Sequence, residues 1–123
     1  MEQLAAVTFL IAHALVHVAV WAMPKPATNP PPFDPNHSWV LAAGRRSPVS
    51  QRTMSVALAW LAAVLFAAAG VALAVDIAAW TAVAVLAAAV GLVLKGLCFN
   101  RWLTLGVALD LAVLVAAMNW PST

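Results

Sequence analysis

Two histidines four residues apart are the side chains in this sequence best placed to do chemistry. His13 and His17 both lie inside an apolar run at residues 4–23. In a helix, residues at this spacing project from one face, with their Cβ atoms about 5–6 Å apart. Two imidazoles so placed can bind one metal ion or pass protons, because histidine ligates metals and titrates near neutral pH. Ionisable side chains inside a membrane helix are functional candidates by default.

Two other interpretations of the histidine pair remain open. A bis-histidine haem would take one ligand from this helix and one from elsewhere, because residues four apart cannot reach both faces of a porphyrin. Alternatively, each imidazole only hydrogen-bonds a carbonyl or a neighbouring side chain inside a helical bundle. The hypotheses are therefore a metal site at His13 and His17, a haem ligand, a proton-handling pair and a purely structural pair.

The single acid of the last apolar run is the second candidate. Asp110 lies inside residues 102–119. Counted from the helix ends beside the basic loops at 1.5 Å per residue, it lies ~12 Å deep, between His17 at ~9 Å and His13 at ~15 Å. If the first and last helices are neighbours, the three side chains meet, and the carboxylate orients an imidazole as a ligand or takes part in proton transfer. Otherwise Asp110 is a protonated acid hydrogen-bonded inside the bundle, or it pairs with a partner subunit.

Four further residues are expected to serve the architecture. Lys95 lies near the end of an apolar run, and we expect its long side chain to reach the membrane interface. His37 lies in a loop and is also expected at the interface. Cys98 is the only cysteine, so an intramolecular disulfide is excluded and an inert thiol is expected. Gly106 precedes Asp110 by one turn and would let another helix approach closely.

The composition places the chain in a lipid bilayer. Of 123 residues, 65% are hydrophobic and 8% are charged. Soluble domains carry about 25% charged residues, so this chain lacks the polar groups to cover a surface exposed to water. The net charge of +2 comes from six Lys and Arg in or beside two loops, which indicates topology rather than nucleic-acid binding. Abundant Ala and Val are typical of high-GC bacterial coding.

Four apolar runs are long enough to cross a bilayer core, which takes about 20 helical residues. They cover residues 4–23, 49–74, 77–97 and 102–119. The first is expected to be a retained helix rather than a signal peptide, because no Lys or Arg precedes it and no cleavage site follows. Very short turns join the last three runs and make their helices antiparallel neighbours. The predicted fold is all-α, a four-transmembrane-helix bundle, in a single membrane domain covering residues 1–123.

The connection at residues 24–47 is predicted to be a stiff, proline-rich loop with one short helix. Five of the ten residues at 24–33 are proline, which favours extended polyproline conformation. Asp34 as a cap, Pro35 as the first helical residue and Gly44 as the stop predict a helix of about nine residues. Such a helix is too short to span the membrane, so we expect it to lie in the interface.

The distribution of charge predicts the orientation in the membrane. Glu2 and Asp76 are the charged residues on the side of the chain ends and of the turn between the second and third helices. All the basic residues lie on the opposite side; they are Lys25, Arg45, Arg46, Arg52, Lys95 and Arg101. By the positive-inside rule the basic loops face the cytoplasm. We therefore expect a multi-pass protein of the inner or plasma membrane with both ends outside.

Two stretches of the chain resemble a group of uncharacterised small four-helix bacterial membrane proteins. Residues 13–17, HALVH, are similar to the His-x-x-x-His of their first helix, and residues 99–110, FNRWLTLGVALD, are similar to their last turn and helix. The resemblance covers most of the chain in layout and these two stretches in residues. It implies a four-helix membrane fold and carries no activity. The long proline-rich connection departs from the shorter loops of the group, as a partner-specific feature would.

Three functions compete on this sequence. The first is an accessory or structural subunit of a larger membrane complex, or a homo-oligomer, because a 12.8 kDa bundle with few polar groups has little room for a solute pathway. The second is a metal-, haem- or proton-handling site at His13, His17 and Asp110 in a redox or transport system. The third is a small oligomeric transporter or channel. A hydrolytic enzyme is disfavoured, because no Ser/His/Asp order, HExxH or paired carboxylates occur. The expected partners are the lipid bilayer and other membrane subunits or a second copy, and no nucleic acid.

Overall fold

The computed structural model describes residues 1–121, and all regular structure in them is helical. Its elements are α1 (Glu2–His17), the π-helical η1 (Val18–Ala22), α2 (Trp39–Ala43), α3 (Pro48–Ala74), α4 (Trp80–Leu97), the 3₁₀ turn η2 (Arg101–Leu103) and α5 (Thr104–Met118). Four segments are long and apolar enough to cross a membrane: α1 with η1, α3, α4, and η2 with α5. The predicted fold class is confirmed, and the chain is a multi-pass membrane protein.

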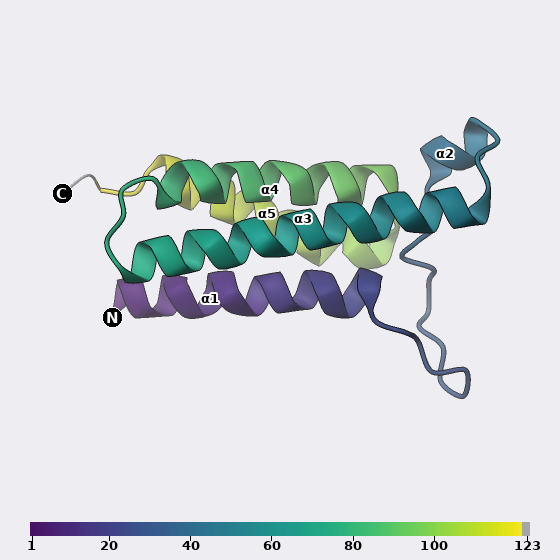
Figure 1. Cartoon of the computed structure of the whole chain (residues 1–123), viewed down its shortest axis with the longest axis horizontal. Helices are drawn as coiled ribbons and strands as arrows, with labels where there is room; N and C mark the ends of the chain where they lie inside the picture. The colour runs from purple at the N-terminus through teal and green to yellow at the C-terminus, as the bar shows by residue number, and fades with distance from the viewer. Residues whose placement is uncertain (122–123) are drawn as a thin grey trace.

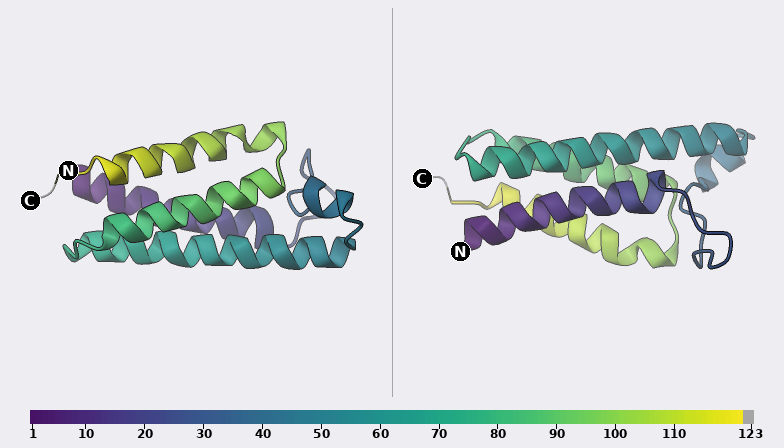
Figure 2. Two further views of the ribbon diagram at one scale, coloured as in Figure 1. Left: turned by 90° about the horizontal axis from the view of Figure 1, so that it is seen from above. Right: turned by 60° about the horizontal axis from the view of Figure 1, so that its bottom comes forward.

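The four long helices alternate in direction around one core (Figure 1). α1 and α4 run one way and α3 and α5 the other, so α1 begins and α5 ends at the same end of the bundle, which we call the terminal end. The opposite end carries α2 and the long connection, and we call it the loop end. α3 packs against α1 and α4, and α4 packs against α5. α1 and α5 are not closely packed, and Figure 2 shows them diverging toward the loop end.

The first membrane-spanning segment changes its helical form directly after His17. Val18–Ala22 forms a π-helix, and Met23 leaves it in extended conformation. Nζ of Lys25 donates to the carbonyl oxygen of Ala19 at 2.7 Å, which satisfies one carbonyl at this helix end. Single π turns inside helices occur frequently at functional sites. This one follows the histidine pair and carries Trp21, which is 2% exposed.

The short helix of the connection begins later than predicted. α2 starts at Trp39, and Ser38 rather than Asp34 is its cap. The predicted start at Pro35 was wrong because tertiary contacts hold the backbone of Ser38 in an extended conformation, φ −108° and ψ 116°. The backbone N–H of Ser38 donates to Oε1 of Gln51 in α3 at 3.0 Å. The side chain of Asp34 caps only a local turn, so the residues before Ser38 follow the surface of the bundle without forming a helix.

A tight turn between α3 and α4 closes the terminal end. Asp76 in this turn has a φ of 58°, a left-handed conformation that aspartate tolerates. From the start of α1, Nε2 of Gln3 donates to the carbonyl of Leu73 at 2.8 Å and to Oδ1 of Asp76 at 2.9 Å. The rings of Trp80 and Trp120 meet edge to face, with their centroids 5.0 Å apart. These contacts fasten α1 and the segment after α5 to the same turn.

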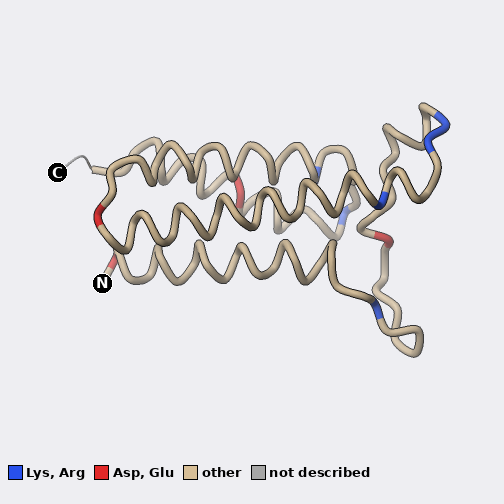
Figure 3. Tube along the Cα trace, in the orientation of Figure 1, with Lys and Arg blue, Asp and Glu red and all other residues tan. Residues whose placement is uncertain are grey.

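Charge is segregated between the two ends of the bundle, as Figure 3 shows. Lys and Arg gather at the loop end, whereas the terminal end, as far as residue 121, carries Glu2 and Asp76 and no basic side chain. Three charged side chains lie in neither group, and one of them, Asp34, is an acid of the long connection at the loop end. Lys95 is 2% exposed and Asp110 is 0% exposed, so both are buried between the helices.

Candidate functional site

Four ionisable side chains meet in the interior of the bundle. They are His13 and His17 from α1, Lys95 from α4 and Asp110 from α5, and we call them the charged network. Each is at most 4% exposed. Oδ1 of Asp110 lies 2.7 Å from Nε2 of His13, and Oδ2 lies 2.6 Å from Nζ of Lys95. Nζ of Lys95 also lies 3.0 Å from Nε2 of His17. The four side chains therefore form one connected set of hydrogen bonds.

The helices position these groups from three sides. In α1, Nδ1 of His17 lies 3.0 Å from the carbonyl oxygen of His13, so the helix fixes the His17 ring through its own backbone. Lys95 extends inward from the last turn of α4, and Asp110 lies near the middle of α5. The network thereby links α1 to α5 through side chains, although the two helices are not closely packed.

Two glycines provide the space that the network occupies. A Cβ atom added to Gly91 would lie 2.5 Å from Oδ2 of Asp110 and 3.2 Å from Nε2 of His17. A Cβ atom added to Gly106 would lie 2.7 Å from Cε of Lys95. The sequence predicted that Gly106 admits a neighbouring helix, and the group closest to it is the lysine side chain. Alanine at Gly91 would displace the carboxylate at the centre of the network.

The hydrogen bonds are consistent with one placement of the protons on the two imidazoles and on Lys95. A lysine ammonium can only donate, so Nε2 of His17 accepts from Lys95, and the proton of His17 lies on Nδ1, which donates to the His13 carbonyl. Asp110 accepts from Lys95 and from Nε2–H of His13. With both imidazoles neutral, the charges of Lys95 and Asp110 cancel. Mutual pairing is what makes two buried charges tolerable in a membrane interior.

Aromatic rings enclose both imidazoles. Phe9 stacks on His13 with the ring centroids 5.4 Å apart, and Phe66 from α3 meets the same ring edge to face at 4.7 Å. Phe66 also contacts the ring of His17 at 5.3 Å, and Trp21 stacks on His17 at 5.7 Å. This apolar enclosure excludes water and lowers the local dielectric, which strengthens each hydrogen bond of the network.

The structure brings together all three side chains that the sequence singled out, His13, His17 and Asp110, and adds a fourth. Lys95 was expected to reach the membrane interface, and that prediction was wrong because Asp110 and His17 hold its ammonium inside the bundle. A signal was present in the sequence. Lys95 is the only charge in residues 77–97 and Asp110 the only one in 102–119, and these runs form adjacent helices. Opposite charges in neighbouring membrane helices favour pairing.

The two predicted metal ligands, His13 and His17, lie with Asp110 at a spacing that suits a metal ion. One donor atom from each of His13, His17 and Asp110 lies within 4.8 Å of the others. The ammonium of Lys95, however, is bonded to two of these three groups, Asp110 and His17. A metal ion would have to displace that ammonium, because two unscreened cations cannot share one buried position. Metal binding by these residues stays a prediction.

A haem fits this packing less well than a metal ion. Ligation through Nε2 would separate His13 from Asp110 or His17 from Lys95. A porphyrin beside either ring would also displace Phe66, which contacts both imidazoles. Haem ligation would therefore require both the hydrogen bonds and the ring contacts of the imidazoles to rearrange.

The remaining candidates lie at the loop end, outside the network. His37 is exposed. Burial, with a smaller effect of the Asp34 carboxylate, raises the pKa of the Cys98 thiol to about 11, so the thiol stays protonated at neutral pH. Burial and the nearby Arg52 lower the pKa of Lys25. None of these groups is hydrogen-bonded to the charged network in the described residues.

Comparison of the chain with protein-family models, with curated proteins and with solved structures finds no match. The fold and the site themselves define the class of protein. It is a small multi-pass membrane protein in which two histidines, a lysine and an aspartate form a hydrogen-bonded network between the helices.

Proposed function

We propose that this protein is a small membrane subunit whose bundle carries an intramembrane proton-handling site. One observation carries the proposal: His13, Asp110, Lys95 and His17 form an unbroken hydrogen-bonded chain, with links of 2.7, 2.6 and 3.0 Å. Every member of this chain can gain or lose a proton. Ionisable groups at such depth are expensive to bury, and proton relays are one of the roles for which membrane proteins retain them.

The four hydrogen-bonded side chains can store or pass a proton because they compete for it. A proton added to His13 would place an imidazolium beside Asp110, whose other oxygen already accepts from Lys95. The carboxylate would then divide its charge between two cations. Lys95 can in turn release a proton to Nε2 of His17, the acceptor 3.0 Å from its Nζ. Groups coupled this closely titrate as one unit rather than independently.

The setting that we propose is an accessory subunit of a larger membrane complex, or a homo-oligomer. The four network residues are at most 4% exposed. Within residues 1–121, one copy of the bundle therefore offers no polar path along which a solute could cross the membrane. A proton-binding site in such a small protein is most useful when a partner subunit responds to the protonation state of that site. A small transporter or channel built from several copies is the alternative, and it would place its pathway between the copies.

The proposed orientation puts the basic loop end in the cytoplasm of a bacterial inner membrane, with both chain ends outside. The segregation of Lys and Arg at the loop end supports it. Reporter fusions at the C-terminus test it. Alkaline phosphatase should be active there and green fluorescent protein should be dark, and the reverse pattern would refute the orientation while leaving the charged network untouched.

Histidine titration by NMR tests proton handling directly. The protein contains three histidines, so selective ¹⁵N-histidine labelling in lipid nanodiscs gives a simple spectrum. The imidazole signals of His13 and His17 should change together over one shared pH range, because the groups are coupled. The variant Asp110→Asn should move that range for both residues and leave the exposed His37 unchanged.

A matched variant controls for general effects of charge. Asp76→Asn removes an acid from the terminal end, outside the network, and should leave the titration of His13 and His17 as in the wild type. Proton handling is refuted if both histidine signals stay constant across the whole pH range in which the protein stays folded, because burial moves a histidine away from its usual titration range. It is also refuted if His13 titrates alone and Asp110→Asn changes nothing.

A metal site is the second candidate function, because three donor atoms lie within 4.8 Å of one another. Metal analysis of gently solubilised protein separates the two functions. If the network handles protons, the wild type should hold no stoichiometric transition metal, and Lys95→Met should acquire Zn²⁺ binding that a further His13→Ala removes. Stoichiometric metal in the wild type, lost in His13→Ala/His17→Ala, would establish the metal site instead.

A further inference from the structure

In the described part of the chain, the buried polar side chains outside the charged network lie toward one end of the bundle. Within residues 1–121, they are Ser38, Gln51 and Ser55. All three lie at the loop end, Ser38 directly before α2 and the other two in the first turns of α3. Between the network and the terminal end, the buried side chains form an apolar cluster dominated by alanine. Water and protons need hydrogen-bond partners, which an apolar membrane interior does not provide.

We infer that the network exchanges protons through the loop end alone, and that residues 35–39, which we call the strap, close this route by holding Trp21 in place. The inference rests on the proposed function, since it names what controls access to the same site. Three sets of contacts carry it: an apolar layer beneath the strap, the hydrogen bond that Trp21 donates to the strap, and the bonds that the strap donates to α4.

A thin apolar layer separates the network from the polar groups of the loop end. The layer consists of Trp21, Ala59, Leu94, Cys98 and Leu103. Trp21 is its largest member and contacts the network directly. Its ring stacks on His17 with the centroids 5.7 Å apart, and Nζ of Lys95 lies 5.5 Å from the indole centroid. The Trp21 ring therefore lies against both the histidine and the lysine of the network.

The strap holds the same indole at its N–H edge. Nε1 of Trp21 donates to the carbonyl oxygen of Pro35 at 2.9 Å. The next strap residue, Asn36, is anchored to α3, with its side-chain amide 2.6 Å from Oγ of Ser55. Trp21 thus contacts the network with its face and the strap with its N–H. The indole cannot leave the apolar layer unless the strap moves or this hydrogen bond breaks.

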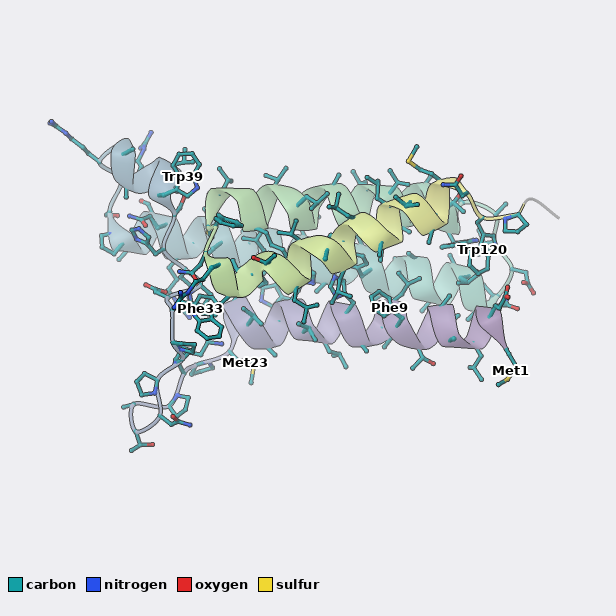
Figure 4. All side chains as sticks on the ribbon, turned by 180° about the vertical axis from the view of Figure 1, so that it is seen from behind. Met1, Phe9, Met23, Phe33, Trp39 and Trp120 are labelled. Atoms are coloured by element: carbon teal, nitrogen blue, oxygen red, sulfur yellow. The ribbon has the colours of Figure 1, made fainter. Side chains whose placement is uncertain are left out.

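Two further hydrogen bonds fasten the strap to the end of α4, where Figure 4 shows Trp39. Oγ of Ser38 donates to the carbonyl oxygen of Leu97, and Nε1 of Trp39 donates to the carbonyl oxygen of Gly96, both at 2.8 Å. These carbonyls belong to the last turn of α4, where no intrahelical N–H is available to them. Water can take the place of the strap donors there, so the strap can open without disturbing α4. A segment held by a few such bonds opens locally far more easily than the bundle unfolds.

The test weakens the strap and measures access to the layer and to the network. The variant Ser38→Ala/Trp39→Phe removes both bonds to α4 and keeps an aromatic ring at position 39. Cys98, 1% exposed within the apolar layer, is the only cysteine, and its alkylation by a membrane-impermeant maleimide reports opening. Exchange of the His13 and His17 imidazole N–H groups with water, followed by NMR in nanodiscs, reports access to the network. Each rate should rise roughly tenfold or more, as expected for the loss of hydrogen bonds that hold a closed state.

Two control variants define the expected direction of access. Gln3→Ala loosens the terminal end by removing the bonds to Leu73 and Asp76. Trp102→Phe alters a loop-end tryptophan that is 53% exposed and outside the strap. Both should keep wild-type rates. Faster imidazole exchange in Gln3→Ala would overturn access through the loop end. If the double variant fails to fold, Trp39→Phe alone gives the same test with a smaller expected increase.

The failure of this inference can be distinguished from failure of the proposed function. If His13 and His17 titrate as a coupled pair but both access rates in the strap variant stay within about twofold of wild type, less than one lost hydrogen bond should give, the strap does not control access. If the histidines do not titrate although Cys98 labelling depends on the strap, both the proposed proton handling and this inference are wrong. The strap would then cover an apolar layer without controlling a proton site. Coupled titration with strap-dependent exchange supports both.

Discussion

The loop half and the terminal half of this bundle are held together by different interactions. In the terminal half, alanines such as Ala69, Ala84 and Ala87 are 0% exposed and let the helices approach closely. In the loop half, the same helices surround Lys95 and Asp110. The terminal half shows that this chain can pack its membrane helices with small apolar residues alone. This contrast supports a functional role for the charges of the loop half over a role in packing.

The two ends also differ in how they are closed. At the terminal end, a tight turn and a contact between two tryptophan rings lie over an apolar cluster, beside a pocket lined by Gln3, Asp76 and Trp120. The loop end is closed by a segment without helical structure up to Ser38, held by side-chain hydrogen bonds to α3 and α4. Local opening requires few apolar contacts to break, and the loop end meets that condition. Substitutions matched between the two halves can test this contrast.

The largest effect is expected from separating the buried charges. Lys95→Met leaves the carboxylate of Asp110 without its cation in the bundle interior. Breaking a buried pair from one side should destabilise the fold by about 3–5 kcal/mol. Thermal or denaturant unfolding in detergent micelles measures this change. Arg46→Met, at an exposed basic residue of the loop end, should change stability by less than about 0.5 kcal/mol.

A double variant separates charge from shape. Lys95→Met/Asp110→Leu removes both charges and should recover most of the stability that Lys95→Met loses, because no unpaired charge remains. It should also abolish coupled titration of the two histidines. If the double variant is as unstable as the single one, the network is required for packing, and the contrast between the two halves does not hold.

A smaller effect is expected at the glycines, where one α4 position touches the network and another does not. Gly91→Ala would place a Cβ 2.5 Å from Oδ2 of Asp110, whereas a Cβ on Gly96 meets nothing within 4 Å. Overpacking of this kind costs about 1–3 kcal/mol, and Gly96→Ala should be neutral or slightly stabilising because alanine favours a helix. Equal unfolding midpoints for both variants would show that the space around the network is not tight.

The sequence predicts much of this fold because the membrane limits the choices. Four apolar runs of sufficient length leave a helical bundle as the simple solution. The i, i+4 spacing of His13 and His17 predicts their shared face, and the helical rise predicts a depth for Asp110 between them. These signals are local, or depend only on distance along a regular helix.

The missed features depend on contacts between distant segments. A lysine near a helix end can point toward the interface or inward, and only the positions of Asp110 and Gly106 in another helix decide the direction taken by Lys95. The late start of α2 has a similar cause. Trp39 bonds a carbonyl 57 residues away in the sequence, and no local pattern predicts that bond.

A hydrogen bond at the terminal end should have a modest and purely structural effect. Gln3→Ala removes the bonds from Nε2 to the carbonyl of Leu73 and to Asp76. We expect a loss of stability of about 0.5–1.5 kcal/mol, the usual range for such bonds. The histidine titration should not change, because the bonds lie at the opposite end from the strap. A shifted titration in this variant would mean that the two halves are coupled.

The smallest effect at neutral pH is expected at Cys98, and it becomes measurable only at high pH. Burial, with Asp34 adding to it, raises the pKa of this thiol from 9.0 to about 11. Above pH 9 the unfolded chain therefore loses the proton while the folded chain keeps it, and the contribution of Cys98 to stability falls as the pH rises toward 11. Cys98→Ala should match the wild type in pH dependence below 9 and lack this additional loss above it. Lys25, whose pKa is lowered, has the opposite effect but is present in both proteins and cancels in the comparison. Parallel stability curves up to pH 11 would mean that the thiol is reached by water in the folded protein, and that the apolar layer beneath the strap is open.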